Sequence, residues 1–293
     1  MPSSGASYLQ TKHDQKGHGN SGNIQHYLTS IVKGFNLNVS DAEHVADVLV
    51  DVGQKYAVSA GELMEAYEKS GAALSATNTS LEKSAGLIAA ANASVQDASI
   101  VGTALKTVSA RIRGSKSDLE ELGESTDDLA EGFSKYADEI KALTGFDIMI
   151  DKTHFKDLYD IMEGIAGVWK NLSDTQQARV AEILGGTRQL QVISSIIGNW
   201  KDAAGAYETA INSAGASSKA NAIYMESVTA HLDQMKAAFE ELSTNVMNSG
   251  FTKFIIDTGK TILEILNNIT KLTGSLGTIL IGGAIYKGVK SIA

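Results

Sequence analysis

The chain contains a single proline, Pro2, so no later position is barred from a helix by a missing backbone N–H. Helix-start signals recur along the rest of the chain. In a capping box, a Ser or Thr and a Glu or Gln three residues later each satisfy an amide that the first helical turn leaves unpaired. Four such pairs are Ser40 with Glu43, Ser59 with Glu62, Thr79 with Glu82, and Ser173 with Gln176. The first three lie about twenty residues apart, which predicts short helices joined by tight links.

Apolar residues follow these starts at intervals of three and four, the period of a helix with one apolar face. The stripes are Ala42, Val45, Leu49, Val52 and Tyr56; Leu63, Tyr67 and Leu74; Leu81, Ala85 and Ile88; and Val101, Leu105, Val108 and Ile112. Isolated helices of this length are only marginally stable in water. We therefore expect them to pack against each other in a compact all-α unit over residues 24–143.

Composition narrows the class of protein further. Aromatic residues make up 6% of the 293 residues, so the core is expected to consist mainly of Ala, Leu, Ile and Val. The net charge of −9 argues against a nucleic-acid coat, because phosphate neutralisation needs clustered Lys and Arg. The absence of cysteine excludes disulfides and thiolate metal sites. Residues 1–30 lack a secretory signal, which predicts synthesis in the cytoplasm.

Residues 1–23 are rich in Ser, Gly, His, Lys and Gln and have few large apolar groups, so we expect a flexible leader. Within it, Gly17–Gly22 fits the G-x-G-x-x-G pattern. A dinucleotide site needs a preceding strand and a surrounding βαβ unit, and neither is predicted here. The leader interpretation is therefore favoured over a cofactor site.

The six histidines were considered as metal ligands. His13, His18 and His26 cluster near the start, but no carboxylate or thiol stands at a useful spacing for zinc, which favours solvated side chains. The other three, His44, His154 and His231, are isolated and are expected to be exposed helix residues.

Residues 144–215 are predicted to be a helical segment with a turn at Gly185-Gly186. A helix beginning after Ser173 carries Val180, Ile183 and Leu184, and the glycine pair supplies the left-handed conformation in which helices commonly end. A second helix restarts at Thr187 and stops near Gly198. Its stripe is Leu190, Ile193, Ile196 and Ile197. The short β-like run Phe146–Ile150 is interpreted as extended chain packed on helices.

Charge changes sign abruptly in the middle of the chain. Between Ala98 and Ser117 the only charges are basic: Lys106, Arg111, Arg113 and Lys116. The following acidic residues are Asp118, Glu120, Glu121, Glu124, Asp127, Asp128 and Glu131. Cations at one helix C-terminus and anions at the next N-terminus suit the helix dipoles, which is the favoured interpretation. The alternative is that the two patches dock between neighbouring chains or against a partner protein.

Residues 216–250 are predicted to form one long helix. Its apolar residues alternate steps of three and four over three heptads: Met225, Val228, Leu232, Met235, Phe239, Leu242 and Val246. The flanking positions are mostly uncharged, so a charge-matched zipper is not indicated. Self-association as a helical bundle and a long helix laid on its own domain remain equal alternatives.

Residues 251–293 are predicted to form an apolar helical tail segment. Its last uncharged run, Leu276–Tyr286, is eleven residues long, short of the roughly twenty that span a bilayer. Lys287 and Lys290 follow it, so contact of residues 254–293 with a host membrane is one interpretation. An amphipathic helix that lacks its partner is the other.

The chain has no P-loop, H-E-x-x-H or G-x-S-x-G motif and no credible Ser/His/Asp set. We therefore assign no catalytic, cofactor-binding or metal-binding residues and expect a protein that is not an enzyme. A peptidoglycan-degrading enzyme is the weakest alternative.

Four blocks carry a resemblance to a known family. They are Ser84–Asn92 with Val101–Gly114, Phe146–Ile150 ahead of Trp169, Leu184–Gln189 (L-G-G-T-R-Q) between two apolar helices, and Ala210–Glu241. Together, in this order, they resemble the core region of phage tail tape measure proteins of the siphophage type. The resemblance covers roughly Phe35 to Phe251.

The resemblance implies a helical structural protein in the lumen of the virion tail tube, made in the bacterial host cytoplasm. Such a protein sets tail length during assembly and is released ahead of DNA at infection. Its implied partners are the tail tube protein, tail assembly chaperones and baseplate proteins, with no specific nucleic acid. A continuous helix of this length would reach about 440 Å at the α-helical rise, short for a whole long tail, so we expect a fragment or a prophage copy.

Overall fold

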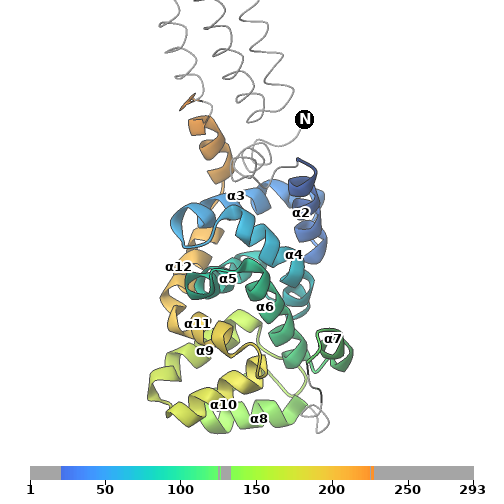
Figure 1. The fold of residues 1–293 in the computed structure, drawn as a ribbon, viewed down its shortest axis with the longest axis vertical. Helices are drawn as coiled ribbons and strands as arrows, with labels where there is room; N and C mark the ends of the chain where they lie inside the picture. Colours follow the sequence, from blue (N-terminus) through green and yellow to red (C-terminus); the bar gives the residue numbers. More distant parts are fainter. Residues whose placement is uncertain (1–20, 125, 127–132, 225, 228–293) are drawn as a thin grey trace, which may run out of the picture. The chain divides into compact units, whose positions relative to one another are not determined.

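The computed structural model describes residues 21–124, 126, 133–224, 226 and 227 (Figure 1). Throughout these residues the secondary structure is helical, apart from connections and one isolated antiparallel bridge between Met149 and Phe155. The predicted all-α class is confirmed.

The helices follow one another with short connections. In chain order they are α2 (Ser21–Gly34), η1 (Val39–Asp41), α3 (Ala42–Lys55), α4 (Ala60–Ala76), α5 (Leu81–Val95), α6 (Ala98–Arg113), α7 (Lys116–Glu121), α8 (Phe133–Thr144), α9 (Leu158–Val168), η3 (Trp169–Asn171), α10 (Asp174–Gly185), α11 (Leu190–Gly198) and α12 (Trp200–Ile211). Residues 216–224 are also helical.

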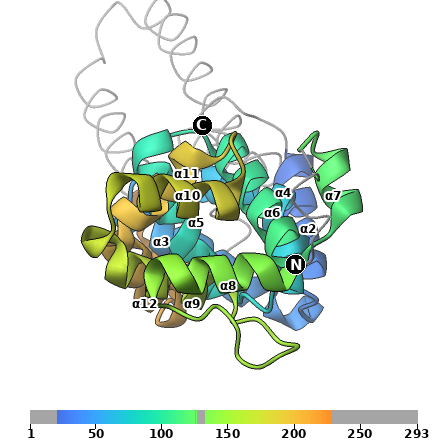
Figure 2. The same ribbon diagram turned by 90° about the horizontal axis from the view of Figure 1, so that it is seen from below.

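Helix α5 lies at the centre of a compact unit that spans Gly22–Ser218. In Figure 1, α2, α3 and α4 lie at one end of this unit and α8 and α10 at the other, with α5 and α6 between them. Seen from below, α8 crosses the face nearest the viewer (Figure 2). Helix α5 packs against α3, α4 and α6 and also against α9, α11 and α12, so both halves of the unit share one core helix.

The burial of α5 corrects one expectation. Its predicted stripe of Leu81, Ala85 and Ile88 is buried, but so is every residue from Ser84 to Asn92. The helix therefore has no solvent face over more than two turns. In α3 the predicted Val45, Leu49 and Val52 are fully buried, but every residue from Val45 to Val50 is buried as well, so its buried surface is also wider than the predicted stripe.

Two glycines allow helices to approach α5 and α6 closely. A Cβ atom at Gly86 of α5 would lie 2.5 Å from the carbonyl oxygen of Ala203 in α12. A Cβ atom at Gly102 of α6 would lie 2.7 Å from the carbonyl oxygen of Ala66 in α4. Both distances are far below van der Waals contact, and the atoms met are backbone. The two helix pairs therefore pack at separations that only glycine permits.

Tyr67 of α4 is the largest fully buried side chain in this core. Its hydroxyl donates to the carbonyl oxygen of Leu81 at 2.6 Å, and its ring meets Phe35 edge to face at 5.5 Å. Burial raises the pKa of Tyr67 well above its usual range. The hydroxyl is thus satisfied as a neutral donor, and it ties α4 to the start of α5.

Two of the four predicted capping boxes are confirmed. Ser59 with Glu62 and Ser173 with Gln176 form reciprocal capping boxes at α4 and α10. The other two are wrong by one to two positions. Before α3, the Asn38 backbone N–H donates to Asp41, so the pair is not Ser40 with Glu43.

At α5 the cap is Ser80, which accepts from the Lys83 backbone N–H. Thr79, the predicted cap, is buried and accepts a hydrogen bond from a different helix, α9. Local sequence rules identified the helix start but could not choose between adjacent hydroxyl residues, because tertiary contacts decide between them.

The predicted extended run Phe146–Ile150 pairs with the chain that follows it. The Lys156 N–H donates to Ile148 at 2.9 Å and the Ile150 N–H to His154 at 2.8 Å. Phe146 packs on Gly164 of α9, where a Cβ atom would lie 2.1 Å from the ring. Ile148 is buried and Ile150 is 68% exposed. The run is therefore extended chain packed on helices, as predicted.

Several predicted segments lie outside the described residues: most of the leader 1–23, the heptad helix beyond residue 227, and the apolar tail 251–293. Over the part of the chain that the structure describes, no helix is long and apolar enough to cross a membrane.

The close approach at Gly86 leads to a test on stability. Replacing Gly86 by Ala should lower the free energy of unfolding by roughly 1–3 kcal/mol, because the Ala203 carbonyl cannot rotate away from the added methyl group. The measurement is urea unfolding followed by circular dichroism. Gly167→Ala in α9 is the matched control, since Gly167 is exposed and a Cβ atom there meets nothing within 4 Å. Equal stability changes for the two variants would contradict the tight α5–α12 packing.

Candidate functional site

The L-G-G-T-R-Q segment forms the turn between α10 and α11. Helix α10 ends at Gly185, and Gly186 follows with a φ of 67°, a conformation that favours glycine. The predicted break at the glycine pair is confirmed. The predicted restart at Thr187 is wrong, because α11 begins three residues later at Leu190. Residues 187 and 188 are exposed in the turn.

Both glycines are also required by their surroundings. A Cβ atom at Gly185 would lie 2.9 Å from the Ile193 side chain of α11. At Gly186 it would lie 3.2 Å from a Glu124 carboxylate oxygen and 3.3 Å from Nη1 of Arg111. The turn is therefore enclosed by α11 on one side and by two charged side chains from the α6–α7 region on the other.

Arg111 is the central charged residue of this site. It is only 6% exposed, and its Nε donates to the carbonyl oxygen of Ile183 at 3.0 Å. Ile183 lies in the last turn of α10, where carbonyl groups lack helical partners and carry a partial negative charge. The predicted match of basic residues to a helix C-terminus is found, because Arg111 and Arg113 lie in the last turn of α6. The Arg111 side chain also reaches the end of a second helix, α10.

A pocket of about 400 Å³ lies at the turn. It is lined by Arg111, Gly123, Glu124, Glu182, Gly186, Thr187 and Arg188. Glu182 also accepts from Arg179 at 3.1 Å, and Arg179 makes a two-point contact with Glu139 of α8 at 2.7 and 3.1 Å. The Glu139 contact raises the pKa of Arg179 above its usual range. The Arg179–Glu139 pair ties α10 to α8 beside the pocket, whereas the Arg179–Glu182 pair lies within α10.

The predicted charge boundary lies next to this pocket. Arg113 and Asp118 approach to 3.8 Å, and Lys106 and Glu121 to 3.9 Å. Exposed pairs at such distances contribute little stability. They do show basic and acidic residues meeting within one chain across the α6–α7 connection. Asp127, Asp128 and Glu131 lie outside the described residues.

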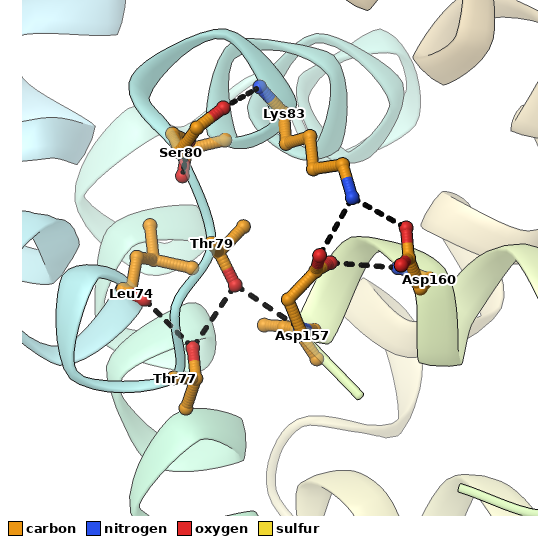
Figure 3. Close-up of polar contacts among 9 residues, drawn as sticks. Leu74, Thr77, Thr79, Ser80, Lys83, Asp157 and Asp160 are labelled. Atoms are coloured by element: carbon orange, nitrogen blue, oxygen red, sulfur yellow. Dashed lines mark hydrogen bonds and ion pairs between the residues drawn. The ribbon is translucent and has the colours of Figure 1, made fainter. Parts of the chain in front are cut away.

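A second polar junction joins the starts of α5 and α9 (Figure 3). Lys83 of α5 donates to Asp157 at 2.6 Å and to Asp160 at 2.5 Å. Asp157 is also the N-cap of α9. Burial acts to lower the pKa of Lys83, but the hydrogen bonds and charges of the two aspartates hold it above its usual value. Lys83 therefore remains charged and neutralises two acidic residues at one helix start.

The threonine beside this ion pair completes the junction. The Leu158 backbone N–H, at the start of α9, donates to the Thr79 hydroxyl at 3.0 Å, and the Thr77 hydroxyl lies 3.0 Å from the same oxygen (Figure 3). Sequence reasoning missed this contact, because residues 79 and 158 are far apart in the chain. The Thr77 hydroxyl in turn donates to the Leu74 carbonyl oxygen at 2.8 Å. The end of α4, the start of α5 and the start of α9 are thus tied together.

The three histidines among the described residues do not come together. His26, predicted to be in the leader, lies in α2 at 3.0 Å from Glu68, and His44 lies 2.6 Å from Glu82. His154 lies in the 151–155 loop beside Asp151, not in a helix, which corrects the expectation. His13, His18 and His231 lie outside the described residues. Within the described ranges no group of three or more histidine or acidic residues is placed to hold a metal ion.

The sequence was compared with known families and structures. A family model described as phage-related minor tail protein matches residues 17–186, more than half of the chain. The chain belongs to the phage-related minor tail protein family. No solved structure matches it significantly. The protein is therefore a component of the phage virion, with a structural role in the tail.

The family match runs from just before α2 to the turn glycine of the pocket. The matched residues of this minor tail protein include Arg111, Glu124 and Glu182 of the pocket, and the polar junction around Lys83 at the starts of α5 and α9. The two polar sites thus lie in the part of the chain that defines the family. Thr187 and Arg188, which complete the pocket, follow directly.

Arg111 gives a direct test of the site. Replacing it by Met keeps the length of the buried side chain but leaves the Ile183 carbonyl oxygen without its donor. We expect the free energy of unfolding to fall by about 1–3 kcal/mol, the cost of an unsatisfied buried polar group. Arg113→Met on the same helix is the control and should change it by less than about 0.5 kcal/mol. Chemical unfolding of the minor tail protein measures both, and a larger effect at Arg113 would refute the role given to Arg111.

Proposed function

We propose that this minor tail protein is a tail tape measure protein. It would occupy the lumen of the tail tube, set the length of the tail during assembly and leave the tube ahead of DNA at infection. The observation that carries the proposal is the combination of the family match with helical structure in the described residues and a three-heptad apolar pattern in the sequence that follows them. The order of the four sequence blocks given above supports the tape measure type within the family.

The candidate pocket supports a binding role rather than a catalytic one. Its charged groups are two arginines and two glutamates, and one of each has a partner: Arg111 donates to the Ile183 carbonyl oxygen, and Glu182 accepts from Arg179 within α10. Groups fixed in this way shape a surface for another protein. We propose that the chain is not an enzyme and that its partners are other copies of itself, the tail tube protein, tail assembly chaperones and baseplate proteins.

Tail length offers the decisive test. Deleting three heptads, residues 226–246, from the phage gene should shorten the tail by about 30 Å, since an α-helix rises about 1.5 Å per residue. Electron microscopy of negatively stained virions measures the change.

A matched control replaces residues 226–246 by an unrelated heptad sequence of the same length. Tails of normal length are expected from this control. Tails that keep their length after the deletion would contradict a ruler function while leaving the family membership intact. Copurification with the tail tube protein tests the proposed partner separately.

Membrane activity through residues 254–293 is a second candidate, favoured by the uncharged run Leu276–Tyr286. Leakage of dye from phospholipid vesicles caused by the full chain, but not by a chain ending at Gly250, is the expected result. Equal leakage by both chains, or none by either, would dismiss the C-terminal segment as the membrane-active part.

A further inference from the structure

Asp47 is a buried acidic residue with no role in the sites described above. It lies in the middle of α3, between Ala46 and Val48, and is 4% exposed. Transfer of a carboxylate from water to a protein interior is costly unless hydrogen bonds replace its hydration. The hydrogen bonds that Asp47 accepts should therefore show what the residue does.

Both oxygens of the Asp47 carboxylate accept hydrogen bonds from the start of one helix. Residues 216–224 are helical, and Gly215 precedes them with a φ of 78°. Oδ2 accepts from the Gly215 N–H at 2.8 Å. Oδ1 accepts from the Ser217 N–H at 2.9 Å and from the Ser217 hydroxyl. Asp47 therefore takes the place of an N-cap side chain from 168 positions earlier in the chain.

Five other helices among the described residues are capped by a side chain of their own sequence. These caps are Ser59 at α4, Ser80 at α5, Asp97 at α6, Asp157 at α9 and Ser173 at α10. The residue directly before the helix at residue 216 is Gly215, and glycine has no side chain with which to accept a hydrogen bond. The capping carboxylate of this helix comes instead from the folded core.

Beginning a helix is its least favourable step, because the first turn orders three residues for a single hydrogen bond. An acceptor that is already in position lowers this cost, and a negative charge there also suits the positive end of the helix dipole. Around Asp47, the α3 residues Val45, Val48 and Leu49 are fully buried, and α3 packs against α5 and α12. The core therefore presents a fixed acceptor to the first turn of the helix at residue 216.

The sequence that follows this first turn carries the three-heptad apolar pattern. Residues 216–224 lead directly to Met225, the first apolar position of the pattern, which ends at Val246. Residues 216–250 are predicted to form one helix, and a single helix needs only one nucleus. Its first turn is the one that Asp47 caps.

We propose that the compact unit seeds this helix and that Asp47 positions its first turn. The folded unit presents the carboxylate, the N–H groups of Gly215 and Ser217 donate to it, and the helix extends from residue 216 toward the C-terminus. Asp47 thereby sets the residue at which the helix begins. The seeding role rests on contacts within Gly22–Ser218 and is independent of the tape measure role.

Hydrogen–deuterium exchange on the full chain tests the seeding role. In Asp47→Asn, an NH₂ group replaces one carboxylate oxygen and the negative charge is lost. Amides of residues 220–224 are the first whose bonds lie within the helix, and they should exchange about five- to thirty-fold faster, as expected for the loss of a helix cap. Amides of α5 should remain much slower than these. Asp51→Asn, one turn further along α3 and paired with the exposed Lys55, is the control and should leave residues 220–224 at the parent rates.

A second variant keeps the test decisive if Asp47→Asn fails to fold. Ser217→Ala removes the hydroxyl contact and keeps the Ser217 N–H, so a weaker acceleration at residues 220–224 is expected, about two- to five-fold for the loss of one hydrogen bond. Parent rates at residues 220–224 in either folded variant would overturn the proposal. Exchange of α5 as fast as that of residues 220–224 would overturn it as well, because Asp47 would then hold the core together instead of seeding the helix.

Discussion

The packing of α5 is the constraint on which the rest of the unit depends. This helix is enclosed by helices from both halves of the unit, and its own side chains from Ser84 to Asn92 are all buried. Small residues are needed where a neighbouring helix approaches α5 closely, because larger side chains would not fit at that point. Gly86 and the alanines around it meet that condition. At Gly86 the backbone of α12 therefore sets the packing distance, while Leu87 and Ile88 supply the larger buried side chains of α5.

Polar contacts then fix the order of the surrounding helices. Each of three charged residues reaches a helix end far away in the chain: Lys83 the start of α9, Arg111 the end of α10, and Asp47 the helix at residue 216. The unpaired amides at the start of the helix at residue 216 favour the anionic Asp47, and the unpaired carbonyls at the end of α10 favour the cationic Arg111. Lys83 instead pairs with two aspartate side chains at the start of α9. Aliphatic packing is tolerant of rearrangement, whereas these contacts are specific. The small residues of the core allow the helices to approach closely. The contacts of charged side chains at helix ends then fix one arrangement of these helices.

Features that depend on residues close together in the sequence could be predicted, and contacts between residues far apart in the sequence could not. Helical stripes and two capping boxes were predicted because they depend on residues three or four positions apart. The contacts of Lys83 with Asp157 and of Asp47 with Ser217 span 74 and 170 positions, so no local pattern encodes them. Two features of the sequence nevertheless indicated unusual burial. Residues 84–95 contain no charge, which is typical of a helix buried on all sides, and Asp47 is the one charged residue in the run Val45–Val50.

A folded unit of this kind bears on how a ruler could work. As a continuous helix, the residues Gly22–Ser218 would span roughly 295 Å at the α-helical rise. As a compact unit of the same length they have a radius of gyration of about 16 Å by the usual scaling. Folding therefore removes most of the length that these residues could contribute. A tape measure built on this chain must take its length from helices outside the unit, or gain it by opening the unit in steps.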